Sequence, residues 1–255
     1  MRARINFLAI AMVLALWWPV LPAAAHQGFK VKLRPNLVNI GIFFGGAKVT
    51  LKGSVPARSQ VAVVLEGPPQ DNHFKRKRHV MGLLWMNQGE VLFRHVPSVY
   101  LVYTSQGVSP ALARKLGFGY RAVRHRADIQ PKEGEEDFLF SQFVKLKEEH
   151  GLYHWQQGGV RLGKPSQGRR PFEVKLDISS RMPPGEYAVQ VLAVDQNHIL
   201  ASDLEHLKVQ ETGLLAQLAN LSQNHGLLYG ILSVLVAIGA GLLMDLIFGT
   251  KKSLH

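Results

Sequence analysis

A long apolar stretch near the C-terminus constrains this chain more than any other feature. Residues 226–244 contain no charged side chain. A helix of about 20 such residues matches the roughly 30 Å hydrocarbon core of a bilayer. Lys251 and Lys252 follow the stretch, whereas residues 211–244 contain no Lys or Arg. This asymmetry predicts a membrane anchor with a cytoplasmic tail at 250–255 and the preceding domain across the membrane.

The N-terminus has the pattern of a secretory signal peptide. Two arginines precede an apolar run at residues 5–18, and Ala23-Ala24-Ala25 provides a small-x-small cleavage pattern. We therefore expect a signal peptide at 1–25 and a mature chain that begins at His26. An uncleaved first helix is the alternative, because the apolar run is nearly long enough to span a membrane.

Composition narrows the partners of the exported domain. Lys and Arg number 30 against 18 Asp and Glu, so the chain carries a formal net charge of +12 and favours anionic partners. Nucleic acid is not expected as a partner of an exported, anchored domain. The chain has no cysteine, so an apolar core rather than disulfides must hold the fold, and thiolate chemistry is excluded.

Residues 26–212 are predicted to form the exported domain, which is mainly β. Alternating or β-branched segments recur with turn residues between them, at 29–33, 37–44, 48–53, 60–65, 80–86, 90–96, 98–104, 172–178, 186–194 and 204–209. Such spacing is typical of a β-sandwich. The Pro184-Gly185-Glu186-Tyr187 turn before a long strand favours an immunoglobulin-like β-sandwich.

A helical insertion is expected near residues 109–150. Ser109-Pro110 predicts the start of a short helix, because Ser caps a helix and Pro fits its first turn. Residues 135–150 predict a second helix that begins with acids and carries an apolar stripe. The basic stretch 118–132 between them matches no pattern.

The segment 213–249 is predicted to contain a juxtamembrane helix and the transmembrane helix. Leu214, Leu218 and Leu221 recur at helical spacing before the apolar stretch. We expect this first helix to run straight into the membrane span with little or no flexible linker.

One face of the predicted span is lined by small residues at steps of three or four. The residues on this face are Gly226, Gly230, Ser233, Ala237, Gly241 and Asp245. Small residues in such a row let two helices approach closely, and an acid within a membrane usually faces protein or water. The face predicts packing against a membrane-protein partner. The alternative for Asp245 is that its side chain reaches the nearby cytoplasmic interface.

Several segments together carry a family resemblance. They are GP at 67–68, the basic run at 75–78, GLLWMN at 82–87, VLFRHVPSVY at 91–100, LKEEHGLY at 146–153, PGEY at 184–187 and HGLLYG at 225–230. Their combination resembles the family described as "putative transmembrane protein" of alpha-proteobacterial type, over most of the chain after about residue 36. The chain departs from that family at 118–132 and at His26.

This resemblance implies a signal peptide, an exported β-rich domain and one C-terminal span in the inner membrane of a bacterium. It implies no established activity. It also suggests a permease as a partner, because such proteins are sometimes encoded near permeases of the sulfite-exporter type.

His26 is the candidate metal ligand. An N-terminal histidine can bind copper through its amine and Nδ1, and copper favours nitrogen ligands. A second histidine would complete the site, but spacing does not select among His95, His154 and His198. The alternative is that histidine merely tolerates the position after a cleavage site, since no His-x-His pattern supports metal binding. The sequence predicts no cofactor.

Two basic groups could meet anionic surfaces. The first is the run Lys75, Arg76, Lys77 and Arg78. It lies in the polar stretch 70–78, which we predict to be the far end of a hairpin, either solvated or docked on anionic headgroups. The second group lies at 114–126 and is followed by acids at 133–137, which favours local charge compensation.

No catalytic motif supports an enzyme. The sequence lacks a Gly-x-Ser-x-Gly nucleophile elbow, a Gly-rich phosphate loop and a His-Glu-x-x-His zinc motif. We expect a membrane-anchored periplasmic protein that acts as a non-enzymatic accessory or assembly subunit for an envelope or membrane-transport partner. The alternative is a stand-alone copper- or ligand-binding module that the helix tethers to the membrane.

Overall fold

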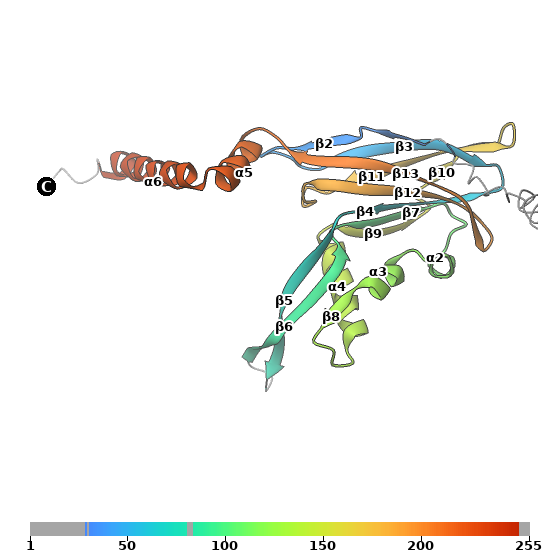
Figure 1. The fold of residues 1–255 in the computed structure, drawn as a ribbon, viewed down its shortest axis with the longest axis horizontal. Coiled ribbons are helices and arrows are strands. Elements are labelled where there is room, and N and C mark those ends of the chain that lie inside the picture. Colours follow the sequence, from blue (N-terminus) through green and yellow to red (C-terminus); the bar gives the residue numbers. More distant parts are fainter. Residues whose placement is uncertain (1–28, 30, 81–83, 250–255) are drawn as a thin grey trace, which may run out of the picture.

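The computed structural model describes residues 29, 31–80 and 84–249 of the chain (Figure 1). Within these ranges the protein is mainly β, with a helical insertion and a C-terminal apolar helix, as the sequence predicted. The predicted signal peptide, the predicted cytoplasmic tail and His26 lie outside the described residues. Side chains at 77–88, 214–216 and 249 are also outside the description.

Two sheets face each other to form a sandwich. The first has the strand order β1 (Val31–Arg34), β3 (Ala47–Pro56), β11 (Arg169–Ile178) and β10 (Arg161–Leu162), and its pairs are antiparallel. Strand β11 shows the half-buried pattern that the sequence predicts. The alternate residues Phe172, Val174, Leu176 and Ile178 are buried, whereas the polar residues between them remain more exposed.

The second sheet has six strands. Their order is β2 (Leu37–Ile40), β13 (His198–Glu211), β12 (Gly185–Asp195), β4 (Gln60–Glu66), β7 (Tyr100–Thr104) and β9 (Tyr153–Gln157). The two edge strands pair in parallel, β2 with β13 and β9 with β7. Strands β4 and β7 are buried on both faces, because the first sheet covers one face and the helical insertion lies over the other (Figure 1).

Between β4 and β7 the chain leaves the sandwich. Strands β5 (Pro69–Val80) and β6 (Leu84–Pro97) form a long antiparallel hairpin, and β8 (Asp128–Gln130) adds a third strand beside β6. Figure 1 shows this sheet extending away from the sandwich with helix α4 (Glu136–Glu149) beside it. We refer to β5, β6, β8 and α4 together as the arm.

Two predictions about this hairpin were wrong. Residues 70–78 lie within β5, and the far end of the hairpin falls later, because Val80 pairs with Leu84. The polar composition of 70–78 suggested a turn, but a strand on a projecting arm can be polar because much of it faces solvent. Residues 87–89, which separate the predicted strands 80–86 and 90–96, form no turn and lie within β6, because an irregularity in the β5–β6 register absorbs Gly89, which has a φ of 119°.

Capping residues in the sequence set the two ends of the first helix of the insertion. Helix α2 (Pro110–Leu116) starts at Ser109, whose Oγ accepts a hydrogen bond of 3.3 Å from an N–H of the first turn. It ends at Gly117, which adopts the left-handed conformation with a φ of 80°. Helix α3 (Tyr120–Arg126) and β8 occupy the stretch 118–132, for which the sequence matched no pattern.

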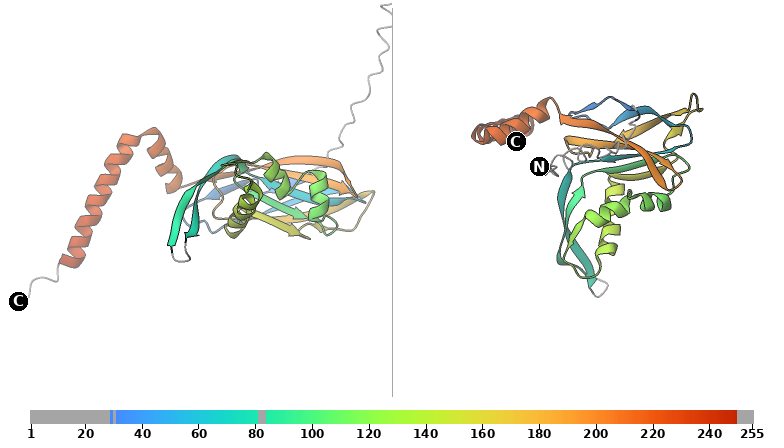
Figure 2. Two further views of the ribbon diagram at one scale, coloured as in Figure 1. Left: turned by 90° about the horizontal axis from the view of Figure 1, so that it is seen from below. Right: turned by 45° about the vertical axis from the view of Figure 1, so that its right-hand side comes forward.

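Two helices follow β13. Helix α5 (Leu214–Asn224) leads to α6 (Gly226–Gly249), with only His225 between them. The linker is as short as expected, but the helices do not run straight, because His225 leaves the helical conformation and α5 meets α6 at a sharp angle (Figure 2). Among the described residues, α6 is the one helix long and apolar enough to cross a membrane, with a mean hydropathy of 2.5.

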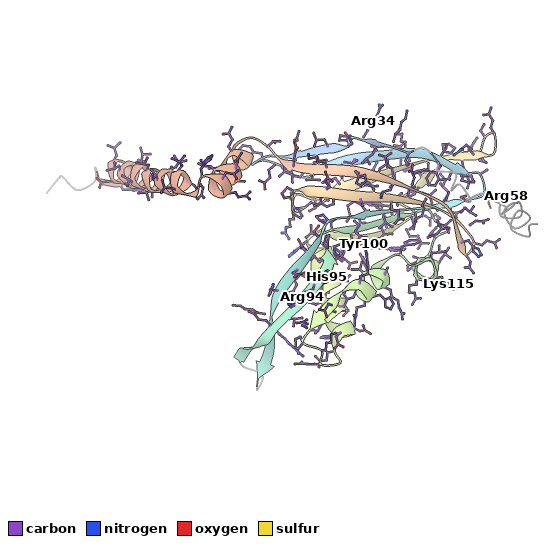
Figure 3. All side chains as sticks on the ribbon, in the orientation of Figure 1. Arg34, Arg58, Arg94, His95, Tyr100 and Lys115 are labelled. Carbon is purple, nitrogen blue, oxygen red and sulfur yellow. The ribbon has the colours of Figure 1, made fainter. Side chains whose placement is uncertain are left out.

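The strand registers define two ends of the sandwich. At the end from which α5 leaves, called the anchor end below, β13 finishes at Glu211, β11 finishes at Ile178 and β3 begins at Ala47. Strand β4 also finishes there, at Glu66, so the arm leaves from the same end. Arg58 marks the opposite end (Figure 3).

Candidate functional site at the anchor end

An open cleft of about 550 Å³ lies at the anchor end. The polar side chains in its lining are Lys48, Tyr103, Glu148, Tyr153, His154, Asp177 and Ser179. Lys48 and Asp177 form an ion pair of 3.9 Å, and both side chains are mostly exposed. The cleft therefore offers groups of both charges to a small polar ligand.

A chain of aromatic rings joins the arm to the sandwich. Phe93 of β6 stacks on Phe143 of α4 with their centroids 4.6 Å apart, and Phe74 of β5 meets both rings edge-on. Phe143 in turn meets Tyr153 of β9 edge-on at 5.7 Å. Pairs with this geometry stabilise a fold beyond the area that they bury. The base of the arm is thus packed directly onto the six-stranded sheet.

Three tyrosines continue this chain into the sandwich. The ring centroids of Tyr100, Tyr120 and Tyr153 are separated by 6.3, 6.1 and 5.9 Å. Tyr153 donates its hydroxyl proton to the carbonyl of Pro97, and Tyr120 donates to Glu148, each at 2.8 Å. Burial raises the pKa of Tyr100 to about 12 and raises the pKa values of the other two as well. All three hydroxyls therefore stay protonated at neutral pH and act as structural donors or acceptors.

Lys147 is the one charged side chain that is buried among the described residues, with 5% of its surface exposed. Its Nζ donates a hydrogen bond of 3.2 Å to Oδ1 of Asn72 and lies 5.4 Å from the ring centroid of Phe143. Burial lowers the pKa of this amine to about 8. Because the amine is covered by the arm itself, it links α4 to β5 rather than meeting a substrate.

The predicted basic run lies along β5. Lys75 is exposed, whereas Arg76 forms ion pairs with Glu133 at 3.2 Å and with Glu135 in the segment before α4. The side chains of Lys77 and Arg78 lie outside the described set. The charge of Arg76 is therefore compensated within the arm, and contact of the whole run with an anionic surface stays a prediction.

An apolar groove of about 200 Å³ passes beside Lys75 and Arg76. It lies between the hairpin and α4, and its apolar lining consists of Phe74, Val91, Phe93, Leu139, Phe143 and Leu146. An apolar groove of this kind suits an apolar side chain. Sequence patterns could not reveal this groove, because the residues of its two sides are at least 46 positions apart in the chain.

The second basic group is compensated in part. Arg124 pairs with Asp137 at 2.7 Å, and Arg126 forms a two-pronged pair with Glu66 at 2.8 and 3.1 Å. The cations of this group without an ion-pair partner among the described residues are Arg114, Lys115 and Arg121. Lys115 lies on α2, away from the arm hairpin (Figure 3).

The histidines that could assist His26 lie on different strands. His95 lies in β6 (Figure 3), and its backbone N–H donates to Oδ1 of Asp71 at 3.3 Å. His154 lines the cleft, and His198 begins β13 at the opposite end. No group of three metal-ligating side chains occurs in the part of the chain that the structure describes. Copper binding at His26 stays a prediction.

The small-residue face of α6 is open. Every residue from Gly226 to Phe248 except Gly239 is exposed, and a methyl group on any described glycine of the helix would meet nothing within 4 Å. The hydroxyl of Ser233 donates to the carbonyl of Tyr229 at 2.8 Å, so it is satisfied within its own helix. The face is therefore available to a second helix.

These features define a class of protein: a membrane protein with one candidate span in its described residues and a mainly β domain that carries an arm at the anchor end. A family model described as "Putative transmembrane protein (Alph_Pro_TM)" matches residues 28–250. The chain therefore belongs to this family, and the resemblance seen in the sequence is confirmed.

Other comparisons add little. No curated protein matches the chain. A solved structure titled "Structural basis of T cell specificity and activation by the bacterial superantigen toxic shock syndrome toxin-1" is similar with a TM-score of 0.25 and 10% identity, over 72% of this chain and 100% of that chain. A similarity this low carries no conclusion about fold or function.

Proposed function

We propose that this protein is a non-enzymatic accessory or assembly subunit of a membrane-embedded partner such as a permease. The proposal includes its location in the inner membrane of a bacterium, with the sandwich and arm in the periplasm and the C-terminus in the cytoplasm. The predicted signal peptide supports this orientation, as do Lys251 and Lys252 after the anchor.

The observation that carries the proposal is that the arm and the anchor leave the sandwich at the same end (Figure 1). A partner in the membrane can therefore contact α6 inside the bilayer and the arm outside it. The open face of α6 offers close helix packing, and the groove beside Lys75 and Arg76 offers a pocket for an apolar side chain.

The titratable groups of the anchor end support a binding role over a catalytic one. The tyrosine hydroxyls are occupied by hydrogen bonds and keep their protons at neutral pH. The amine of Lys147 is buried in the base of the arm. Neither arrangement presents an activated group to the cleft.

The strand order also supports an immunoglobulin-like sandwich. The sheet β1-β3-β11-β10 corresponds to strands A-B-E-D, and β13-β12-β4-β7 corresponds to G-F-C-C′. Tyr187, near the start of β12, is fully buried and donates its hydroxyl proton to the carbonyl of Pro183. This contact has the geometry of the tyrosine corner at the start of strand F.

Affinity purification of the full-length protein from mildly solubilised membranes tests the proposed function. Mass spectrometry should find a stoichiometric polytopic membrane protein. Ala237→Leu and Gly241→Leu should release it, because leucine would push the helices apart. Gly239→Leu, on the opposite face of α6, should retain it. Purification of the protein alone, or equal binding by all variants, would refute the accessory role.

The cleft favours a second candidate function, a stand-alone module that binds copper or a small polar ligand. The test is the metal content of the processed, membrane-bound protein after dialysis against copper. One copper ion per chain that is lost in His26→Ala would support this alternative, whereas copper binding unaffected by that variant would exclude the N-terminal site.

A further inference from the structure

The loop between β2 and β3 contains a turn of unusual composition. The N–H of Phe44 donates to the carbonyl of Gly41 at 3.1 Å, and this bond places Ile42 and Phe43 at the two corners of the turn. Such corners favour Gly, Pro, Asn, Asp and Ser. Local structure therefore does not account for two large apolar residues at these positions.

Phe43 is more exposed than a folding role would require. Phe43 has 98% of its surface exposed and Ile42 has 56%, whereas the next residue, Phe44, packs against the core. Other exposed apolar residues of the sandwich, such as Leu204 at 53%, lie on strands that cover about half of their surface. An apolar loop tip that the fold leaves uncovered marks an interaction surface.

The position of the turn points to the partner. Strand β2 runs parallel to β13 with Ile40 opposite Glu211, and the N–H of Thr212 donates to the carbonyl of Ile40 at 2.9 Å. The turn therefore begins where the chain leaves the sandwich for α5 and the membrane span. This is the part of the sandwich that is tethered most closely to the bilayer.

The orientation of helix α5 relative to the membrane sets the distance between the turn and the lipid. Standing upright, its 11 residues would hold the sandwich about 16 Å above the span. The bend at His225 turns α5 away from the axis of α6 (Figure 2), and Leu214, Leu218 and Leu221 recur on one face of the helix. A helix with such a face can lie in the membrane interface, which brings the turn down to the lipid.

A neighbouring loop adds a cation to this surface. A Cβ on Gly46 would lie 2.9 Å from the carbonyl oxygen of Ile178, so the β2–β3 loop abuts the loop that follows β11. That second loop carries Arg181, which is exposed and has no ion-pair partner among the described residues. A cation on the loop next to an apolar turn suits the phosphates and acyl boundary of a phospholipid surface.

We propose that the loop at residues 41–46 is a membrane-docking wedge. Ile42 and Phe43 enter the phospholipid interface beside the anchor, and Arg181 contacts lipid phosphates. This contact fixes the orientation of the sandwich on the bilayer, and it requires the membrane span but no protein partner.

Because the chain has no cysteine, single labels can test the wedge in the full-length protein. Nitroxide labels are placed on Phe43→Cys, on Ile238→Cys within α6 and on Ile199→Cys at the opposite end. Each variant is reconstituted into vesicles of phosphatidylcholine and phosphatidylglycerol, and access of a water-soluble nickel chelate is measured by electron paramagnetic resonance. The label at 43 should be shielded from the nickel chelate several-fold more than the label at 199. Its shielding should be close to that of the label at 238.

A second label position tests whether the shielding depends on the side chains of Ile42 and Phe43 rather than on an apolar label at position 43. A nitroxide on Gly45→Cys should be shielded in the otherwise native chain and should become accessible when Ile42→Ser and Phe43→Ser are added. Gly45 suits this use because a side chain there would meet nothing within 4 Å.

The failures are distinguishable. Equal nickel access at 43 and 199, with the label at 238 shielded, overturns the wedge and leaves the anchor intact. Access at 238 overturns the span on which the wedge depends. Shielding at 43 in native membranes but not in pure lipid vesicles would mean that a protein covers the turn, and would overturn the lipid contact.

Discussion

The sandwich and the arm are held together in different ways. Between the two sheets the buried side chains are almost all apolar, and residues such as Val49, Leu51 and Leu176 have no exposed surface. The arm has three strands and one covering helix, and its packing is concentrated in the rings around Phe143. It also buries the amine of Lys147 without a carboxylate partner in the described residues.

This difference shows which part of the molecule supplies stability and which part can be reshaped. A hairpin with so little cover is marginal in isolation, so the arm depends on the sandwich through contacts such as that between Phe143 and Tyr153. Binding elements are commonly drawn from the less stable parts of a fold. We therefore expect the arm to open before the sandwich does.

The largest effect should come from Phe143→Ala. Loss of this buried ring should lower the free energy of unfolding by about 3–5 kcal/mol. Hydrogen exchange followed by mass spectrometry should show lost protection in β5, β6 and α4, with β3 and β11 still protected. The control is Phe138→Ala on the same helix, where the ring is 61% exposed and the change should stay within about 0.5 kcal/mol. Equal loss in β3 and β11 would mean that the arm and the sandwich unfold as one unit.

Lys147→Met should change the way in which the stability of the protein depends on pH. In the native chain the folded amine loses its proton near pH 8, while the unfolded amine keeps it until about 10.5. Because the unfolded state binds more protons in that window, stability should rise from pH 8 to pH 10.5, by roughly 3 kcal/mol. At neutral pH the buried ammonium is unfavourable in the folded state, so the Met variant should be more stable there.

The measurement is the melting temperature of the full chain in mild detergent across pH 7–10.5. The Met variant should lack the rise that the native protein shows. Lys145→Met, which changes an exposed lysine two residues away, should retain it. A native profile that is flat above pH 8 would contradict a buried, unpaired amine at Lys147.

On the sandwich side, Tyr187→Phe should produce a smaller loss. The variant keeps the buried ring and removes one hydrogen bond to Pro183, which should destabilise the protein by about 1 kcal/mol. Chemical unfolding of the full chain would measure this. A tyrosine corner should stabilise β12, so an increase of hydrogen exchange in the arm and not in β12 would contradict this role for Tyr187.

The smallest effect is expected at the surface of the arm. Arg76→Gln removes the ion pairs to Glu133 and Glu135 and should lower the stability by less than about 1 kcal/mol. This loss should be smaller at high salt, because salt screens the two pairs in the native protein. Thermal unfolding at low and high ionic strength tests this. A large loss that persists in high salt would show that Arg76 supports the arm by packing rather than by charge.

Local signals made much of the sandwich and the anchor predictable. Alternation marked β11, the Ser109 cap marked α2, and length with low charge marked α6. The arm was less predictable, because its polar strand β5 is stabilised by contacts with α4 that are distant in sequence. The hydrogen bond between Asn72 and Lys147 joins residues 75 positions apart.

The burial of Lys147 did leave a signal. The buried face of α4 consists of Phe140, Phe143, Val144 and Lys147, at steps of three and four residues. The stripe of Leu139, Phe143 and Leu146 fits the same periodicity, rotated slightly around the helix. A charged residue in line with three apolar ones was therefore visible, but the sequence could not show that β5 would cover it.

The central claim is that the arm and the anchor meet one partner in the membrane. Photo-crosslinking amino acids placed singly at Leu139 in the arm groove and at Ala237 in α6 test it in intact cells. Ile199, at the opposite end of the sandwich, is the control position. The account predicts that positions 139 and 237 capture the same polytopic membrane protein and that position 199 does not. Capture of unrelated proteins at the two positions, or no membrane protein at either, would contradict it.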